Sequence, residues 1–451
     1  MSKVAIIGGG GVRTPLVIDG LAQVRLGVTE VVLYDIDGER AKTIARLGAE
    51  VLRQFDQPFQ IRTSTDLREA ASDAQFVLNS VRAGGMSARA RDERISIDHG
   101  LAGQETTGPG GAAMALRTLP ITLGHAEVVE DVAPDAWFIN FTNPAGLVTQ
   151  ALTQNTRLRV IGICDTPMEL FHRIAEALNE PRAEMAFDYA GLNHLGWVRR
   201  VFVRGQDVTE RLLGDVDLLR RLYPSELFDP KLIQTLELIP TEYLFFYYSQ
   251  RKAYRNQLRA GSTRGEELQR LNDELFAQLA VEDSSEALET YRKYLARRNA
   301  SYMKLEGQGG SAFSLPEHHE NPFETATGYH RIALDVMSGL MSESPSELIL
   351  NVTNAGAIED LEVDDIVEVP CDLDCHGPRP RRTGRLPESV RGLVESVKAY
   401  ERTIIKAALA GSAALARLAL LEYPIVGEWE ISTDIIRELI EKDQQFLGYL
   451  R

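Results

Sequence analysis

The sequence contains little cysteine, and this shortage excludes a disulfide-stabilised scaffold. Its 451 residues include three cysteines, Cys164, Cys371 and Cys375. Small secreted domains that depend on disulfides carry many more cysteines, at paired spacings. We therefore predict a protein of the reducing cytoplasm.

The sequence also lacks an excess of basic residues and lacks long apolar runs. Acidic residues outnumber basic residues by 65 to 49, which gives a formal net charge of −16. A nucleic-acid surface needs a basic patch, and a membrane-spanning helix needs about 20 apolar residues. The first residues also lack the pattern of a signal peptide. We therefore expect neither a nucleic acid nor a membrane as a partner.

Short apolar segments alternate with helical segments over the first 165 residues. Predicted strands occupy residues 3–7, 30–34, 75–78, 136–141 and 159–163, and helical spacing covers residues 15–26 and 38–55. Such alternation is typical of βαβ units and a parallel sheet. The later pattern predicts strands at 199–203 and within 346–372, helices within 208–300 and 388–450, and a loop at 373–386.

Four consecutive glycines, Gly8, Gly9, Gly10 and Gly11, lie between the first predicted strand and the first predicted helix. Glycines at this point let the backbone approach a pyrophosphate, which the helix N-terminus attracts. Arg13 replaces the third glycine of the usual fingerprint, but Asp35 ends the second strand, where an acid binds ribose hydroxyls. The acid would repel a 2′-phosphate, so the pattern favours NAD over NADP. The alternative is a tight turn that binds no nucleotide.

These observations predict an α/β fold with two domains. Residues 1–165 are predicted to form an NAD-binding domain with a Rossmann-type parallel sheet. Residues 166–451 are predicted to form an α+β domain for substrate binding, catalysis, metal binding and oligomerisation. The expected architecture is similar to that of lactate and malate dehydrogenases.

Cys164 and His194 form a candidate metal site. Cys164 follows the predicted strand 159–163, at the strand end where open α/β sheets bind their ligands. A thiolate and an imidazole together suit a divalent transition metal and leave coordination positions open. The alternative is that each is an ordinary core or surface residue. Cys371, Cys375 and His376 lack the second half of a zinc site and are interpreted as a strand end and a loop.

Tyrosines and arginines supply further candidates. An aromatic stretch contains Tyr243, Tyr247 and Tyr248. It is either a core-facing helix or the source of a base, since one tyrosine beside a cation can act as a base. Arginines between residues 82 and 94 form either a phosphate site or a solvated helix face. They are Arg82, Arg89, Arg91 and Arg94.

Taken in order, the motifs resemble those of glycoside hydrolase family four, the NAD- and divalent-metal-dependent 6-phospho-glycosidases. The resemblance runs along nearly the whole chain. It rests on segments at residues 7–15, 34–37, 103–111, 140–144, 163–167, 189–194, 240–243 and 367–371.

The resemblance implies hydrolysis through temporary oxidation, an exception to two-carboxylate glycosidases. NAD⁺ takes a hydride from C3 of the sugar, and the resulting ketone acidifies the C2 proton. Mn²⁺, or another divalent transition metal, stabilises the charge on the C2 and C3 oxygens. The leaving group is eliminated, water adds, and the hydride returns. The implied substrate is a small phosphorylated disaccharide or glucoside of carbohydrate metabolism.

The resemblance also implies roles for individual residues. Tyr243 matches the base that removes the C2 proton, and Asp165 matches an acid for the leaving group. Cys164 and His194 match the metal ligands. Positions that line the sugar or its 6-phosphate are matched by Arg89, Asn143, Asn193 and Arg264. Glu105 lies in the most family-specific segment, but we assign it no role. A homodimer or homotetramer is expected by analogy.

Two residues depart from the family pattern. Gly11 stands where serine is common, so one hydrogen bond to the nucleotide or phosphate is lost. Asp165 stands where β-specific members tend to carry asparagine, and α-specific members carry aspartate. Because most of the chain resembles the β branch, we predict a 6-phospho-β-glucosidase. The alternatives are a 6-phospho-α-glucosidase of the same family and a 2-hydroxyacid dehydrogenase of the lactate/malate type.

Overall fold

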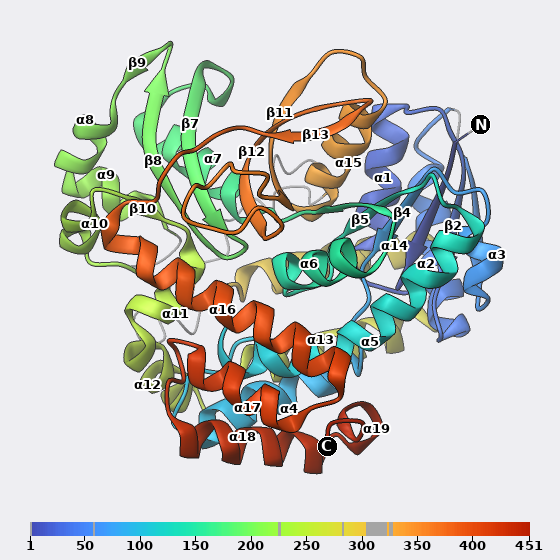
Figure 1. Cartoon of the computed structure of the whole chain (residues 1–451). Helices are drawn as coiled ribbons and strands as arrows, with labels where there is room; N and C mark the ends of the chain where they lie inside the picture. The colour runs from blue at the N-terminus through green and yellow to red at the C-terminus, as the bar shows by residue number, and fades with distance from the viewer. Residues whose placement is uncertain (1, 57–58, 224–226, 282–283, 304–322, 324–327) are drawn as a thin grey trace.

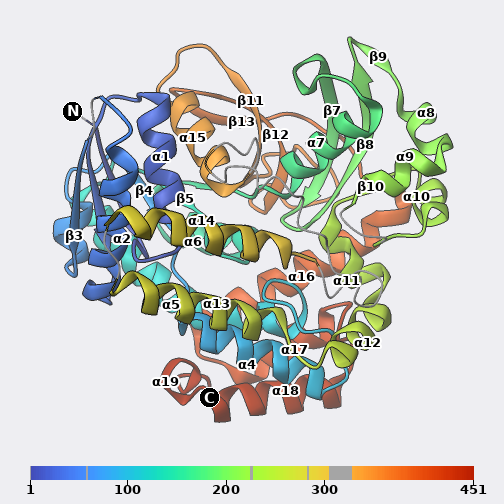
Figure 2. The same ribbon diagram turned by 180° about the vertical axis from the view of Figure 1, so that it is seen from behind.

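The computed structural model describes residues 2–451 except 57–58, 224–226, 282–283, 304–322 and 324–327. Figure 1 shows a twisted sheet across the molecule with helices packed on its faces, and Figure 2 shows the same arrangement from behind. Among the described residues, no helix is long and apolar enough to cross a membrane.

Parallel strands form the N-terminal part of the sheet, in the spatial order 3-2-1-4-5-6 of a Rossmann-type fold. They are β1 (Ser2–Ile7), β2 (Val28–Tyr34), β3 (Gln60–Ser64), β4 (Phe76–Asn79), β5 (Trp137–Asn140) and β6 (Arg159–Gly162). The predicted parallel sheet is confirmed. Strand β3 was not predicted, because it is a partly exposed edge strand with polar residues at most positions.

Antiparallel strands continue the sheet beyond β6. They are β7 (Met185–Leu192), β8 (Leu195–Val203), β9 (Gln206–Asp207), β10 (Ile239–Pro240), β11 (Ser346–Thr353), β12 (Ile366–Asp374) and β13 (Gly377–Pro380). Strand β11 joins β6 by pairing Asn351 with Gly162. In the described part of the chain, the main path of the sheet is β10-β8-β7-β12-β11-β6-β5-β4-β1-β2-β3.

The predicted loop at 373–386 is wrong in its first half. Cys371 to Asp374 pair with Gly377 to Pro380, so β12 and β13 form a hairpin. Arg379 and Arg381 brace it through ion pairs of 2.6 Å with Asp374 and Asp372. The run of prolines and arginines therefore pairs as an edge strand, where proline is tolerated.

The helices fall into three groups along the chain. Those of the first 180 residues are α1 (Thr14–Val24), α2 (Gly38–Leu52), α3 (Leu67–Ala71), α4 (Gly85–Asp98), α5 (Gly108–Val132), α6 (Ala145–Asn155) and α7 (Thr166–Leu178). The middle group contains η1 (Arg182–Glu184), α8 (Thr209–Gly214), α9 (Val216–Arg221), α10 (Pro230–Leu236), η2 (Glu242–Leu244), α11 (Phe245–Tyr248), α12 (Gln250–Ala260), α13 (Arg264–Leu279), α14 (Ser284–Ala300) and α15 (Tyr329–Leu340). The C-terminal group is α16 (Glu388–Ala410), α17 (Ala413–Glu422), α18 (Trp429–Lys442) and α19 (Gln444–Leu447). In Figure 1 the C-terminal helices, α4 and α13 lie together below the sheet.

A buried ion-pair network fastens this helical layer. Arg117 of α5 donates to Asp443 at 2.7 Å, to the Ala83 carbonyl at 3.0 Å, and to Asp92 of α4. The Arg117 side chain is fully buried, and Asp443 directly follows α18. The network therefore joins α4 and α5 to the C-terminal helices. It also holds the Ala83 carbonyl, in the segment between β4 and α4.

Removing the cation of this network should strongly destabilise the protein. In Arg117→Met, the carboxylates of Asp92 and Asp443 lose their shared buried partner, so we expect the free energy of unfolding to fall by about 3–5 kcal/mol. Urea unfolding followed by circular dichroism measures the change. Arg157→Met is the control, because the Arg157 side chain is 90% exposed in its pair with Glu130, and it should unfold as the wild type does. Equal effects of the two changes would mean that the buried network does not stabilise the helical layer.

Candidate active site

The glycine loop has the compact form of a dinucleotide-binding turn. Gly8 and Gly9 both donate backbone hydrogen bonds to the Tyr34 carbonyl, at 3.0 and 2.8 Å. A Cβ atom on Gly9 would lie 2.7 Å from Leu33, and one on Gly8 would lie 2.9 Å from the Ser80 carbonyl oxygen. The close packing against β2 and β4 therefore requires glycine. The loop leads directly into α1, whose N-terminus carries partial positive charge.

Asp35 lies where the loop and the end of β2 meet. Its carboxylate accepts hydrogen bonds from the Gly10 and Asp37 amides, at 2.9 and 3.0 Å. A carboxylate has further lone pairs, so it can still accept from ribose hydroxyls. The loop and Asp35 thus fit the sugar and pyrophosphate of a dinucleotide.

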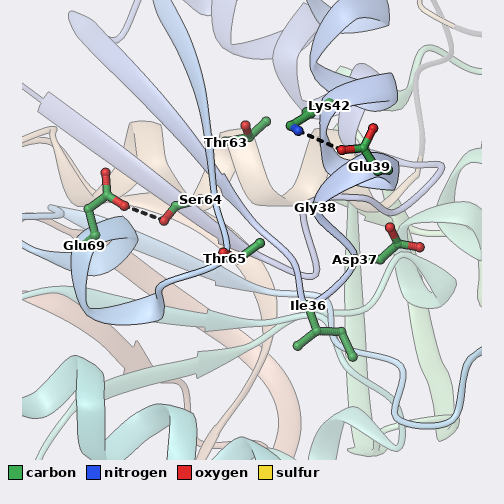
Figure 3. Close-up of a pocket in the computed structure, with 9 residues that line it drawn as sticks. All are labelled: Ile36, Asp37, Gly38, Glu39, Lys42, Thr63, Ser64, Thr65 and Glu69. Atoms are coloured by element: carbon green, nitrogen blue, oxygen red, sulfur yellow. Dashed lines mark hydrogen bonds and ion pairs between the residues drawn. The ribbon is translucent and has the colours of Figure 1, made fainter.

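A pocket opens next to Asp35, between the ends of β2 and β3 (Figure 3). Its lining residues are Ile36, Asp37, Gly38, Glu39, Lys42, Thr63, Ser64, Thr65 and Glu69. Lys42 is paired with Glu39 at 2.7 Å, and Glu69 accepts a hydrogen bond from Ser64 at 2.6 Å. Carboxylates outnumber the one lysine of this lining, so the pocket disfavours a bound phosphate.

Cys164 lies two residues beyond β6, at the carboxyl end of the parallel strands. Its side chain is buried, and its Sγ contacts the Thr166 hydroxyl at 3.4 Å. Burial, together with the nearby Glu368 and Asp165, raises the pKa of the Cys164 thiol well above its usual value. A thiolate at this position therefore needs a cation beside it.

His194 occupies the tight turn between β7 and β8, with a φ of 60°. Its side chain is 2% exposed, and neither ring nitrogen has a hydrogen-bond partner among the described residues. Burial lowers the pKa of His194 to about 3, although Glu105 opposes the shift. A buried neutral imidazole with unpaired nitrogens suits metal binding, because a metal ion would supply the missing partner.

Tyr243 stacks on His194, with ring centroids 3.8 Å apart and an interplanar angle of 11°. The stacking follows from the strand pairing, because β10 pairs with β8 and Thr241 donates to the Gly196 carbonyl at 2.9 Å. Burial and nearby acids, Cys164 among them, raise the pKa of Tyr243 well above its usual value. The structure thus brings Cys164, His194 and Tyr243 together, and a cation there would favour ionisation of the phenol.

Glu105 faces this group from the segment between α4 and α5. It forms ion pairs with Arg82 at 2.6 Å and with Arg89 at 2.8 Å. Burial raises its pKa, but the two arginines hold the pKa of Glu105 well below its usual range. Arg89 is buried and also bonds Glu93 at 2.8 Å. The predicted sugar residue Arg89 therefore lies close to Tyr243, but its charge is already balanced by acids.

Glu368 of β12 is a site residue that sequence reasoning missed. It accepts hydrogen bonds from Tyr189 at 2.7 Å, Asn351 at 2.9 Å and Asn193 at 3.3 Å. Burial raises the pKa of Glu368 to about 7, although these hydrogen bonds lower it. Two signals in the sequence could have found it: an acid between the valines of a strand-like run, Val367-Glu368-Val369, and its place in the family-like segment 367–371.

The two predicted asparagines follow different strands, and a hydrogen bond of Asn193 brings their segments together. Asn193 precedes His194 in the turn, and its Oδ1 accepts a hydrogen bond from the Ala145 amide at 3.0 Å. Asn143 lies between β5 and α6, two residues before Ala145. Glu368 and Ala145 therefore hold the Asn193 amide from both ends, next to the segment that carries Asn143.

Arginines gather on the other side of Asp165. Arg264, the first residue of α13, donates to Ser301 at 3.0 Å and lies 5.2 Å over the Tyr302 ring. Burial lowers the pKa of Arg298 to about 10; Tyr294 opposes the shift, and the charges of Arg13 and Arg264 add to it. Cations this close to one another suit an anionic ligand. Arg298 could not be singled out, because the sequence of α14 is rich in charges throughout.

The two halves of the chain match the two models of one family. Residues 3–180 match "Family 4 glycosyl hydrolase", and residues 189–426 match "Family 4 glycosyl hydrolase C-terminal domain". The chain belongs to family 4 of the glycosyl hydrolases. The family expected from the motifs is therefore confirmed.

Full-length relatives of this family 4 glycosyl hydrolase are known. A Bacillus subtilis (strain 168) protein named "Probable 6-phospho-beta-glucosidase" is 32% identical, over 99% of this chain and 97% of the relative. The 6-phospho-beta-glucosidase of Thermotoga maritima is 30% identical, over 99% of both chains. A Clostridium acetobutylicum phospho-alpha-glucosidase is 27% identical, over 99% of both chains.

Solved structures agree with this assignment. The T. maritima 6-phospho-beta glucosidase, solved with manganese, NAD+ and glucose-6-phosphate, superposes with a TM-score of 0.82 at 28% identity, covering 99% of each chain. A lactate dehydrogenase from a deep-sea metagenome superposes with a TM-score of 0.54 at 14% identity, over 90% of this chain and 99% of that one. The second likeness concerns the fold alone, and it confirms the predicted dehydrogenase-like architecture.

Glu368 should stabilise the family 4 fold around the site. In Glu368→Ala, the buried donors of Tyr189 and Asn351 lose their acceptor, so we expect the free energy of unfolding to fall by about 3 kcal/mol. Glu368→Gln keeps one acceptor oxygen, so its free energy of unfolding should fall clearly less than that of Glu368→Ala. Urea unfolding without cofactors measures both variants. Equal falls in the free energy of unfolding would mean that the lost hydrogen bonds do not cause the destabilisation.

Proposed function

We propose that this family 4 glycosyl hydrolase cleaves 6-phospho-β-glucosides, with NAD and a divalent transition metal such as Mn²⁺ as cofactors. The observation that carries the proposal is the buried His194, whose unpaired imidazole lies against Tyr243 in the neighbourhood of Cys164. The names and bound ligands of the relatives support the choice of substrate and cofactors.

In this proposal, Gly8 to Gly11 hold the NAD pyrophosphate and Asp35 binds the ribose. The acidic pocket beyond Asp35 supports NAD over NADP, because a 2′-phosphate would meet Glu39 and Glu69. Cys164 and His194 hold the metal. When bound, NAD supplies reversible hydride transfer at C3 of the sugar, and the metal supplies positive charge beside the C2 and C3 oxygens.

The residues of the chain perform the proton chemistry. Tyr243 takes the proton from C2, and the bond between C1 and the leaving group then breaks. Asp165 protonates the leaving oxygen. Arg89, Asn143 and Asn193 orient the sugar hydroxyls by hydrogen bonding. Elimination beside a carbonyl needs a base and charge stabilisation and requires no protein nucleophile.

The arginine cluster is proposed to bind the 6-phosphate. Arg264 was expected there from the family resemblance, and Arg298 and Arg13 extend the same cluster. Guanidinium groups bind phosphate oxygens in bidentate fashion. An overall charge of −16 does not oppose this, because the local field of clustered arginines dominates at short range.

The β anomer is supported by the more similar of the named relatives. Asp165 is the residue that departs from this branch, where the resemblance implies asparagine. Burial raises the pKa of Asp165 to about 6, although Arg13 opposes the shift. Part of the population is then protonated near neutral pH and can protonate a leaving group. The alternative within the family is a 6-phospho-α-glucosidase. The activity of a 2-hydroxyacid dehydrogenase would give no function to the group formed by Cys164, His194 and Tyr243.

We further propose that the protein acts in the cytoplasm, as a homodimer or homotetramer with a small phosphorylated disaccharide or glucoside as its partner. A cytoplasmic location is supported by the free Cys164, which must stay reduced to bind a metal. Residues 1–165 as an NAD-binding domain and 166–451 as a catalytic domain remain our proposal for the domain boundary.

A substrate panel tests the proposed reaction. With NAD⁺, Mn²⁺ and a thiol reductant, we expect nitrophenol release from nitrophenyl 6-phospho-β-glucoside. The unphosphorylated glucoside should show kcat/KM at least about 100-fold lower, because it cannot pair with the arginines. The 6-phospho-α-anomer should react more slowly than the β-anomer. Faster cleavage of the α-anomer would favour the alternative, and hydrolysis that continues in EDTA without NAD⁺ would contradict the mechanism.

Metal binding tests the ligand assignment without any turnover. His194→Ala should weaken Mn²⁺ binding by more than about 100-fold, which exceeds the usual effect of residues outside the ligand sphere. Electron paramagnetic resonance of free Mn²⁺ gives the affinity. His99→Ala is the matched control, because His99 pairs with Glu438 at 2.7 Å on the far helical layer. Unchanged Mn²⁺ affinity in His194→Ala would remove His194 from the ligand set.

A further inference from the structure

Glu93 of α4 is a buried carboxylate that the proposed reaction leaves unused. It is 1% exposed, and its two oxygens bind different partners. Oε1 accepts a hydrogen bond from Nε of Arg89 at 2.8 Å, and Oε2 accepts one from the Gly265 amide at 2.6 Å. The carboxylate therefore ties a side chain of α4 to the backbone of α13.

The two partners of Glu93 lead to different parts of the proposed substrate. Arg89 is proposed to orient the sugar hydroxyls, and Gly265 directly follows Arg264, which is proposed to bind the 6-phosphate. Gly265 is the second residue of α13, so its amide is one of the N-terminal groups that have no partner within the helix. Negative charge is favoured at that position. Glu93 therefore fixes the helix end that carries Arg264 relative to Arg89.

The helices pack closely around this carboxylate. Figures 1 and 2 show α4 and α13 side by side. A Cβ atom on Gly265 would lie 3.0 Å from the backbone of Ala90 and 2.9 Å from Oε2 of Glu93. A Cβ atom on Gly103 would lie 2.4 Å from the Glu93 carbonyl oxygen, so the segment that leads to Glu105 packs on the same turn of α4. Glu93 therefore lies at a tightly packed junction of α4, α13 and this segment.

We propose that Glu93 is a positioning residue that sets the distance between the sugar-binding Arg89 and the phosphate-binding Arg264, and so makes cleavage depend on the 6-phosphate. The inference rests on the proposed function, which assigns these two arginines to the substrate. A phosphate at C6 is remote from the reacting carbons, so its binding energy raises kcat only when its site is rigidly joined to the groups at those carbons. Glu93 provides this connection through its two hydrogen bonds.

A carboxylate of this length is needed to serve both partners. Arg89 and the Gly265 amide are both donors, so the group between them must offer two acceptor oxygens. In Glu93→Gln the amide oxygen accepts from one partner, and the NH2 group faces the other donor. In Glu93→Asp the charge is kept, but the side chain is too short to keep both bonds. Arg89 retains its ion pair with Glu105, at 2.8 Å in the wild type, so the variants change its position and leave it paired.

Separate measurement of kcat and KM on two substrates tests the inference. The substrates are nitrophenyl 6-phospho-β-glucoside and the unphosphorylated glucoside, with NAD⁺ and Mn²⁺ present. In Glu93→Gln and Glu93→Asp, kcat for the phosphorylated substrate should fall about 10- to 100-fold while its KM stays near the wild-type value, because the phosphate still binds but no longer aligns the sugar. The unphosphorylated glucoside should lose much less, because a sugar without a phosphate anchor can follow Arg89. The preference for the phosphorylated substrate therefore falls.

Two controls separate positioning from general damage to the site. Inorganic phosphate should inhibit the Glu93 variants with the same affinity as it inhibits the wild type, because the arginines of the phosphate site are unchanged. Glu438→Gln is the matched substitution, because Glu438 of α18 binds His99, at the other end of α4, at 2.7 Å. It should keep the wild-type kcat and the wild-type preference for the phosphorylated substrate.

The possible results distinguish this inference from the proposed function. Should Glu93→Gln fail to fold, Glu93→Asp, which keeps the charge, carries the test. Unchanged kcat in the folded variants, equal losses with both substrates, or loss of folding in both variants would overturn the positioning role alone. A wild-type protein that cleaves no phosphorylated glucoside would overturn the proposed function and this inference with it.

Discussion

Removal of water from ionisable groups is the constraint on which the site depends. Cys164, His194 and Tyr243 are buried at one edge of the sheet. Burial keeps the imidazole neutral, and burial together with nearby acids keeps the thiol and the phenol protonated. In the proposed function, one cation bound beside them would change all of these states. A thiolate would gain a counter-ion, an imidazole nitrogen would gain a partner, and the phenol would ionise more readily.

The acids around this group are paired with arginines or with hydrogen-bond donors. Glu105 lies between Arg82 and Arg89, and Glu368 accepts three hydrogen bonds. A second group of arginines surrounds Arg298, and the proposed function assigns the substrate phosphate to it.

The sheet explains how distant residues meet. In the Rossmann half, parallel strands place the glycine loop, Asp35 and Cys164 along one edge. Strands β11 and β12 extend the sheet antiparallel beyond β6, and β12 pairs Glu368 with Gly191 beside the His194 turn. The dehydrogenase-like half holds the dinucleotide-binding loop, and the added strands bring the remaining groups to its edge.

The sequence by itself determined the features that depend on local pattern. A glycine run after a strand, an acid at the end of the next strand, and a cysteine and a histidine after strand-like runs are visible because each lies in its own short motif. Tertiary structure alone decided the contacts of Glu368, Arg298, Tyr302 and Glu105. Glu368 and Asn193 are 175 residues apart, and Tyr302 and Glu242 are 60 apart. Their contacts follow from strand order and helix packing, and a buried acid or arginine has no local signature until its partner is in place.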